Sequence, residues 1–320
     1  MNAGPRLSGP AADILPTSEF RIVITGASGW IGRATLELLY NTLGADAFTR
    51  RVVAFGSSPR AVDFGQGRAI EQKALADIAQ LPPMPTLVLH LAFLTKDKVA
   101  GMDEDDYRRS NRELSQTVLD ALDAIDARAV FVASSGAAAF ADDPAASEAM
   151  RLYGSLKKAD EDAFSAWADA RDRRAVVARI FALSGPHINK HDTYALASFI
   201  KDALAGQDIS IRADFPVYRA YVAIRELMSL VFAAMLDGST GVLHFSSGGE
   251  RLEMQEVAEV VSATIGPVSI KRPPLNGNKT DEYVGYDVTY RQLLAAYSLE
   301  HLPFAQQVVE TADFFALDQG

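Results

Sequence analysis

The chain contains no cysteine, which excludes disulfides, thiolate metal sites and cysteine nucleophiles and fits a cytoplasmic protein. It also lacks any apolar run near the roughly 20 residues that a membrane-spanning helix needs, so we expect no membrane partner. Residues 1–19 combine Gly, Pro, Ala and Ser without a basic start or an apolar core. We interpret this segment as a flexible leader and not as a signal peptide.

Positive charge is scarce, because the sequence has 31 Lys and Arg but 41 Asp and Glu, which gives a net charge of -10. A surface this acidic repels the phosphate backbone of nucleic acids, so we expect no nucleic-acid partner. An anionic substrate would have to be met by arginines placed locally against the overall field. His, Asp and Glu do not cluster with metal-ligand spacing, so we expect no metal site.

Apolar segments of strand and helix length alternate through the first half of the chain. The predicted strands are Arg21–Thr25, Arg51–Phe55, Thr86–Leu91, Ala129–Ala133 and Ala175–Phe181, and the predicted helices are Ile31–Leu43, Asp105–Ile125 and Leu152–Ala170. This order predicts an α/β fold, a Rossmann-type doubly wound parallel sheet over residues 20–186. The pattern loosens over residues 187–320, where we expect mainly a smaller C-terminal α/β substrate lobe, with allowance for chain crossings back to the sheet.

Residues 21–33 read Arg-Ile-Val-Ile-Thr-Gly-Ala-Ser-Gly-Trp-Ile-Gly-Arg, a buried strand followed by a glycine turn and the start of a helix. Gly26, Gly29 and Gly32 leave room for a tight turn, for a pyrophosphate and for close packing of the helix on the strand. The segment therefore predicts a dinucleotide site. Taken alone the signal is weak, since glycine-rich turns join many strands to helices that bind nothing.

A second motif, Tyr153-Gly-Ser-Leu-Lys157, places a tyrosine and a lysine on one face of a helix, and Ser134-Ser135 follows a predicted strand between the two motifs. In this order the three motifs resemble the extended short-chain dehydrogenase/reductase family, of the NAD-dependent epimerase/dehydratase type. That family holds sugar-nucleotide epimerases, dehydratases and ketoreductases. The resemblance covers roughly residues 20–317.

The resemblance implies that Tyr153 is the general acid/base. A phenol with a pKa near 10 is a poor base at neutral pH, so Lys157 would lower that pKa while binding the nicotinamide ribose. Ser135, with Ser134 as the alternative, would hydrogen-bond the reacting oxygen. Phe140 stands where the family has tyrosine, which leaves the choice between the serines open. Asn111 matches the helix asparagine that supports the lysine through water.

The cofactor choice depends on the residues after the second strand, where NAD enzymes place an acidic side chain and this chain has Gly56. Ser57, Ser58, Arg60 and Arg33 could bind a 2′-phosphate, so NADP is favoured over NAD. In the competing interpretation Ser57 binds the adenosine ribose and Arg60 faces water. The full predicted cofactor set is Gly26, Ser28, Gly29, Trp30, Ile31, Gly32, Arg33, Gly56, Ser57, Ser58, Arg60, Leu91, Ala92 and Lys157.

For the substrate, Arg219-Ala-Tyr-Val222 is similar to a family stretch whose arginine pairs with a diphosphate. Arg272 is a second candidate phosphate contact or an ordinary loop arginine, and His187 lies in a loop that we include in the substrate half. Ala182 replaces an asparagine that commonly touches the diphosphate in the family. We expect an anionic small-molecule substrate, a sugar nucleotide or a related compound.

These features together predict an NAD(P)-dependent oxidoreductase, a ketoreductase or dehydrogenase acting on a sugar nucleotide or a related hydroxy or keto compound. One alternative is a nucleotide-sugar 4-epimerase that retains NAD, and another is a non-catalytic nucleotide-sensing protein on the same fold. Dehydration is disfavoured, because Gly136 and Ala137 stand where the dehydratases carry Asp and Glu. The family often forms homodimers through the helices that correspond to 105–125 and 152–170, so we expect a homodimer.

Overall fold

The computed structural model describes residues 4–95, 101–191, 193–277 and 279–318. The chain forms two compact units, which we take one at a time. The first unit holds the chain up to Ile180 together with Met228–Phe245, and the second holds Phe181–Leu227 and the chain from Ser246 onward. The first passage between units thus comes at Ile180 and not at Pro186, and the segment from Met228 to Phe245 returns to the first unit.

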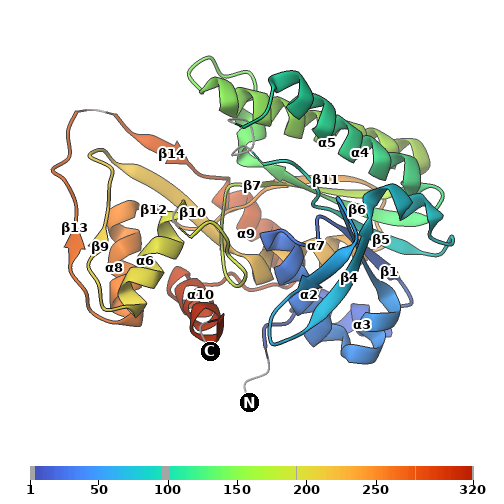
Figure 1. Cartoon of the computed structure of the whole chain (residues 1–320), viewed down its shortest axis with the longest axis horizontal. Helices are drawn as coiled ribbons and strands as arrows, with labels where there is room; N and C mark the ends of the chain where they lie inside the picture. Colours follow the sequence, from blue (N-terminus) through green and yellow to red (C-terminus); the bar gives the residue numbers. More distant parts are fainter. Residues whose placement is uncertain (1–3, 96–100, 192, 278, 319–320) are drawn as a thin grey trace. The chain divides into compact units, whose positions relative to one another are not determined.

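The first unit is built on an eight-stranded sheet with the order β11-β7-β6-β5-β1-β2-β4-β3 (Figure 1). Its strands are β1 (Arg21–Thr25), β2 (Val52–Gly56), β3 (Arg60–Asp63), β4 (Ala69–Ala74), β5 (Thr86–His90), β6 (Ala127–Ser135), β7 (Arg174–Ile180) and β11 (Gly241–Ser246). β1 pairs in parallel with both β2 and β5, so the strand order reverses beside β1. This is the switch point at which doubly wound sheets bind their ligands, and the predicted Rossmann-type fold is confirmed.

Helices cover both faces of this sheet (Figure 1). One face carries α2 (Trp30–Leu43) and α3 (Ala45–Arg51), and the other carries α4 (Glu104–Leu122) and α5 (Glu148–Arg171). Every residue of β1 and β5 is buried, as expected for central parallel strands that read as continuous apolar runs. Val118 and Leu122 of α4 belong to the core beneath the sheet, so these apolar positions serve the sheet and do not provide a dimer face.

The N-terminal segment packs against the first unit, and the expected flexible leader is wrong for residues 4–19. Helix α1 (Pro10–Ile14) and the 3₁₀ turn η1 (Leu15–Thr17) follow each other there. Leu7, Ala11 and Leu15 recur every four residues and are at most 1% exposed. Arg51 adds hydrogen bonds from its guanidinium to the carbonyl oxygens of Leu15 and Phe20. Residues 1–3 of the expected leader lie outside the described residues.

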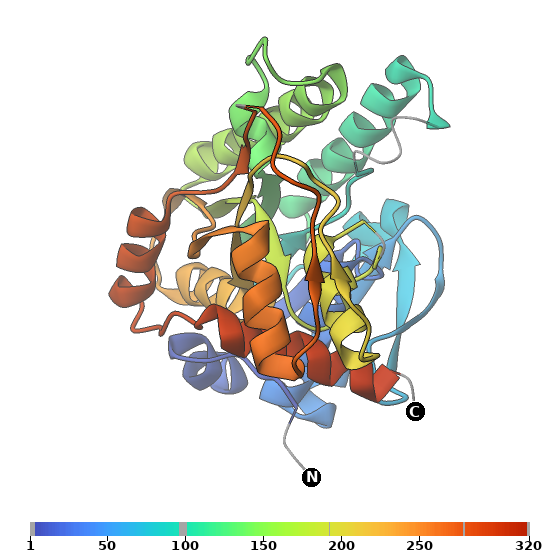
Figure 2. The same ribbon diagram turned by 90° about the vertical axis from the view of Figure 1, so that its left-hand side faces the viewer.

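The second unit combines short strands with packed helices (Figure 2). In its sheet β10 pairs with β12, β14 and β8, and β9 and β13 form a separate pair. The strands are β8 (Ala182–Ser184), β9 (Ile209–Ser210), β10 (Val217–Ala223), β12 (Arg251–Glu253), β13 (Ile270–Lys271) and β14 (Asp281–Tyr283). The helices are α6 (Ala195–Leu204), α8 (Met254–Ile265), α9 (Asp287–Ala296) and α10 (Phe304–Asp318), and α7 (Ile224–Leu236) contains the passage back to the first unit. α6, α8 and α10 contact one another.

Candidate functional site

The glycine turn between β1 and α2 has no room for side chains at two positions. Gly26 has φ +71°, and a Cβ there would lie 2.7 Å from the backbone nitrogen of Ala92. A Cβ on Gly32 would lie 2.6 Å from the carbonyl oxygens of both Gly26 and Ala27. The residues that follow Gly29 begin α2, whose first amides have no partner within the helix. The turn therefore has the close backbone approach and the helix N-terminus that a pyrophosphate requires.

The rest of the predicted cofactor set is distributed around this turn. Ser28, Trp30 and Ile31 are half-buried in the turn and the first turn of α2, and Arg33 is exposed one residue beyond Gly32. Leu91 and Ala92 are held beside Gly26, because the hydroxyl of Thr25 accepts hydrogen bonds from both of their backbone nitrogens at 3.2 Å. The turn after β5 is thereby fixed next to the glycine turn.

A neutral amide, the side chain of Gln72, lies against the end of β2, where NAD enzymes place a carboxylate. A Cβ on Gly56 would lie 2.2 Å from the side-chain nitrogen of Gln72, which is 1% exposed in β4. That nitrogen donates to the carbonyl oxygen of Ser58 at 2.8 Å. Ser57, Ser58 and Arg60 are exposed, and Arg60 donates to the hydroxyl of Ser28 at 2.6 Å. The sequence did not predict the position of Gln72, because no pattern in it indicated that β4 is the strand beside β2.

Tyr153 and Lys157 both come from α5, and both contact Phe93. The Lys157 ammonium donates to the carbonyl oxygen of Ala133 at 2.8 Å and lies 3.6 Å from the centre of the Phe93 ring. Burial lowers the pKa of Lys157 to about 8, against the opposing charges of Asp160 and Glu161. Tyr153 is half-buried with its ring 5.7 Å from that of Phe93. The Tyr-x-x-x-Lys spacing thus brings both side chains to Phe93 in the loop after β5, and Lys157 also reaches β6.

The two candidate serines occupy different environments at the end of β6. Ser134 is 4% exposed and donates to Glu161 Oε1 at 2.5 Å. Ser135 is half-buried, and its hydroxyl accepts from the backbone nitrogen of Ala137 at 3.2 Å, at the start of the 3₁₀ turn η4 (Gly136–Phe140). Successive strand residues point to opposite faces of a sheet, so the two hydroxyls do not share one position.

Glu161 is the centre of a buried ion-pair cluster that the sequence-based prediction missed. Arg179 donates to its two oxygens at 2.9 and 2.7 Å, and His244 Nε2 lies 3.1 Å from Oε2. Burial raises the pKa of this carboxyl, but the hydrogen bonds from Arg179, His244 and Ser134 outweigh it and hold the pKa at about 2. The available signal was the spacing of Glu161 four residues after Lys157, on the same helix face.

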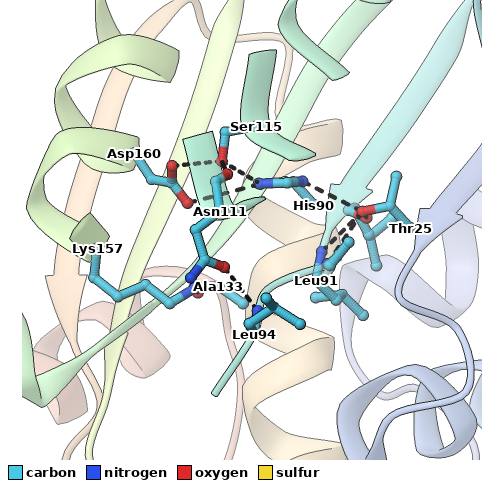
Figure 3. Close-up of polar contacts among 11 residues, drawn as sticks. Thr25, His90, Leu91, Leu94, Asn111, Ser115, Ala133, Lys157 and Asp160 are labelled. Atoms are coloured by element: carbon cyan, nitrogen blue, oxygen red, sulfur yellow. Dashed lines mark hydrogen bonds and ion pairs between the residues drawn. The ribbon is translucent and has the colours of Figure 1, made fainter. Parts of the chain in front are cut away.

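Asn111 holds the loop after β5 in place. Its Oδ1 accepts from the backbone nitrogen of Leu94 at 2.8 Å, and its Nδ2 donates to the carbonyl oxygen of Tyr107 at 3.2 Å. Figure 3 shows Asn111 between this loop and the Lys157 side chain. The asparagine predicted to support the lysine therefore orders the loop that contains Phe93, whose ring contacts the Lys157 ammonium.

The three predicted substrate residues lie in the second unit. Arg219 pairs with both oxygens of Asp281, at 3.1 and 3.3 Å. Arg272 pairs with both oxygens of Glu253, at 2.7 and 2.9 Å, and Glu253 caps α8. His187 is 7% exposed with φ +62°, and its ring lies 4.9 Å from that of a phenylalanine of α10. Each of these side chains thus has a partner within its own unit.

Neither a metal site nor a membrane span is found in the part of the chain that the structure describes. No group of three or more His, Cys, Asp or Glu there could hold a metal ion. None of the helices in that part is long and apolar enough to cross a membrane.

A family model described as the NAD dependent epimerase/dehydratase family matches residues 22–245. The chain belongs to this family. The resemblance seen in the sequence motifs is therefore confirmed. For this family member, the dinucleotide turn, the Tyr153–Lys157 pair and the sheet order described above all fall within the matched segment.

Solved structures similar to this family member include a UDP-N-acetylglucosamine 4-epimerase from Methanobrevibacter ruminantium M1, with a TM-score of 0.70, 18% identity, and coverage of 95% of this chain and 100% of that chain. Another is a UDP-glucose 4-epimerase from Thermus thermophilus, in complex with NAD, with a TM-score of 0.66, 18% identity, and coverage of 93% and 99%. At such identities the likeness shows the fold.

Among curated proteins, UDP-glucuronic acid decarboxylase 3 from Arabidopsis thaliana is 29% identical over 91 residues, which are 28% of this chain. The chain matches 26% of the length of that decarboxylase. The family assignment therefore rests on the match to the family model, which spans residues 22–245.

Proposed function

We propose that the protein transfers hydride between a nicotinamide dinucleotide and a sugar nucleotide, or a related hydroxy or keto compound, as a ketoreductase or dehydrogenase. The observation that carries this proposal is the meeting of three features at one edge of the sheet. The glycine turn follows β1, the turn with Ala92 follows β5, and Lys157 is anchored on Ala133 near the end of β6. Parallel register brings these strand ends together.

The residues at this edge fit a dinucleotide, because Gly26 and Gly32 leave backbone where side chains would block a pyrophosphate. When bound, the cofactor supplies the hydride donor or acceptor. The N-terminus of α2 binds the pyrophosphate, and Lys157 has ammonium protons beyond the one given to Ala133, with which it can bind ribose hydroxyls. Phe93 covers the ammonium and limits its access to water.

Tyr153 moves the proton. In reduction its hydroxyl donates to the ketone oxygen, and in oxidation its phenolate takes the proton of the substrate hydroxyl. The nearby Lys157 cation stabilises the phenolate and lowers the pKa of the phenol toward the working pH. Of the two serines we propose Ser135 as the group that hydrogen-bonds the reacting oxygen, because the Ser134 hydroxyl is committed to Glu161 in the core.

We further propose that the cofactor is NADP, in preference to NAD. Gly56 is covered by the Gln72 amide, so no carboxylate at residue 56 would repel a 2′-phosphate. Arg60 already reaches the glycine turn at Ser28, and Ser57 and Ser58 are exposed between these two points. A guanidinium flanked by hydroxyls suits a phosphate, which accepts charge-assisted hydrogen bonds.

The test is to denature the purified protein, identify any released dinucleotide by mass spectrometry, and titrate the emptied protein with NAD and NADPH. We expect an empty protein that prefers NADPH and that reduces keto-sugar nucleotides in a screen. Stoichiometric tightly held NAD would overturn the reductase in favour of a 4-epimerase. Dinucleotide binding without turnover on any keto or hydroxy substrate, in a protein with Tyr153 intact, would favour a nucleotide sensor.

A further inference from the structure

A chain of buried polar side chains runs through the first unit from the glycine turn to α5 (Figure 3). The Thr25 hydroxyl lies 3.3 Å from His90 Nδ1, and His90 Nε2 lies 3.4 Å from the hydroxyl of Ser115 on α4. Ser115 in turn donates to Asp160 Oδ1 at 2.6 Å. Asp160 stands one helical turn after Lys157. This series of polar contacts therefore joins the last residue of β1 to the helix that carries the proposed catalytic pair.

Asp160 is charged although it is buried. Only 6% of the residue is exposed, and its second oxygen, Oδ2, has no hydrogen-bond partner among the described residues. That oxygen lies 3.7 Å from His90 Nε2. Burial raises the pKa of the carboxyl, but the contact with His90, the charge of Lys157 and the hydrogen bond from Ser115 lower it overall. A buried carboxylate that lacks one hydrogen bond needs a nearby positive charge.

Lys157 has the matching requirement, because its ammonium is buried and needs a negative charge nearby. Asp160 and Glu161 are the carboxylates whose charges raise its pKa against burial. Glu161 is already paired with Arg179 and His244, which leaves Asp160 as the carboxylate of this pair without an arginine of its own. The two carboxylates are themselves faced by described charged or titratable groups of three strands, namely His90 of β5 beside Asp160, and Arg179 of β7 and His244 of β11 beside Glu161. Tyr153 of α5 contacts the same Phe93 ring as the ammonium.

We propose that Asp160 is the counter-charge of Lys157 and a positioning residue of the dinucleotide site, joined through Ser115 and His90 to the turn that carries Gly26. Asp160 touches neither substrate nor cofactor. It acts by keeping the Lys157 ammonium charged, and a charged ammonium binds the ribose and stabilises the Tyr153 phenolate. The inference rests on the proposed dinucleotide function of this site.

The experiment measures NADPH affinity by fluorescence titration from about pH 6 to about pH 9.5. In the wild-type protein the affinity should fall as pH rises through the pKa of Lys157, about 8, because the ammonium then loses its charge. Lys157→Met should abolish this fall and so assign it to the lysine. Asp160→Asn should move the fall to lower pH by about one unit, which makes binding about threefold weaker near pH 7.5 and about tenfold weaker above about pH 9.

Two control variants separate charge from structure. Asp162→Asn removes an exposed carboxylate from the same helix and should leave the fall where it is. Ser115→Ala removes a hydrogen bond to Asp160 but keeps its charge, so the fall should again stay near pH 8. If Asp160→Asn does not fold, the pH dependence of NADPH affinity in Ser115→Ala still tests the proposal. In that variant the charge of Asp160 is kept, so a change in the pH at which affinity falls would overturn the role of the charge.

The outcomes distinguish this inference from the proposed function. If the wild-type protein binds neither NADPH nor NAD, the proposed function fails, whatever Asp160 does. If the wild-type protein binds NADPH and the pH at which affinity falls is unchanged in Asp160→Asn, the inference alone is overturned. A shift produced by Asp160→Asn and by neither control would support it.

Discussion

Replacement of Glu161 by glutamine should destabilise the first unit at neutral pH and progressively less in acid. The carboxylate accepts hydrogen bonds from Arg179, His244 and Ser134, and its pKa of about 2 lies below the ordinary value of 4.5. Each unit of pKa difference corresponds to about 1.4 kcal/mol of unfolding free energy. The depressed pKa therefore gives the charged Glu161 about 3 kcal/mol of stabilisation at neutral pH.

The sign of the pH dependence follows from the direction of that shift. A carboxyl whose pKa is lower in the folded protein stabilises it fully above the unfolded pKa, and this stabilisation is lost as pH falls from about 4.5 toward about 2. The difference in unfolding free energy between wild type and Glu161→Gln should therefore be constant from pH 7 to about pH 5 and shrink below that. The contact with Arg179 is the largest of the interactions that lower this pKa, so its loss in the glutamine variant is already counted in that difference.

Urea unfolding followed by tryptophan fluorescence is the suitable assay, because the two tryptophans, Trp30 and Trp167, both belong to the first unit. With a urea dependence of about 3 kcal/mol per molar, the midpoint of Glu161→Gln should fall by about 1 M at pH 7. Asp162→Asn, an exposed change on the same helix, should stay within about 0.5 kcal/mol of wild type. A midpoint for Glu161→Gln equal to that of Asp162→Asn at pH 7 would refute the reasoning.

Four further changes test the cofactor and substrate sites. Tyr153→Phe should lower turnover by about 10² or more with nearly unchanged NADPH affinity, and retained turnover in steady-state assays would remove its assignment as the acid/base. Arg60→Ala should weaken NADPH binding by about tenfold and spare NAD, whereas equal losses for both in fluorescence titrations would argue against a 2′-phosphate site. Gly26→Ala should abolish dinucleotide binding in the same titrations, because φ +71° and the 2.7 Å approach forbid a Cβ, and wild-type affinity would contradict this geometry. Asp281→Asn should raise the affinity for UDP several-fold in calorimetry by releasing Arg219, and an unchanged affinity would place Arg219 outside the substrate site.

The sequence predicted the central strands well because both of their faces are buried. β1 has the bounds Arg21–Thr25 that its apolar run indicated. The hairpin of β3 and β4 was missed, because these strands lie at the edge of the sheet with mostly exposed, polar residues and no alternating pattern. The N-terminal helix was missed because five residues carry little periodicity of their own and are held by packing.

In the candidate site, local motifs identified the residues that a short segment can specify. The glycine turn and the Tyr153–Lys157 pair follow from spacings of a few residues. The residues that support them could not be found in this way, since Asp160 depends on Ser115, 45 positions away, and Glu161 depends on a histidine 83 positions away. Their hydrogen-bond partners become neighbours only when α4 and β11 pack with α5, and spacing within a segment carries no sign of that.

The two arginines assigned to substrate binding are not equivalent once their partners are known. Arg272 is 12% exposed, its carboxylate partner also caps α8, and it donates to a carbonyl oxygen, so displacement would leave several groups unpaired. Arg219 pairs with an Asp281 side chain that is 46% exposed, and a solvent-exposed ion pair of this kind contributes only about 0–1 kcal/mol. A diphosphate carries more charge than the carboxylate and can replace it on the guanidinium at little cost. If the substrate has a diphosphate, we therefore propose Arg219 as the arginine that binds it and Arg272 as an arginine that serves the structure of the lobe.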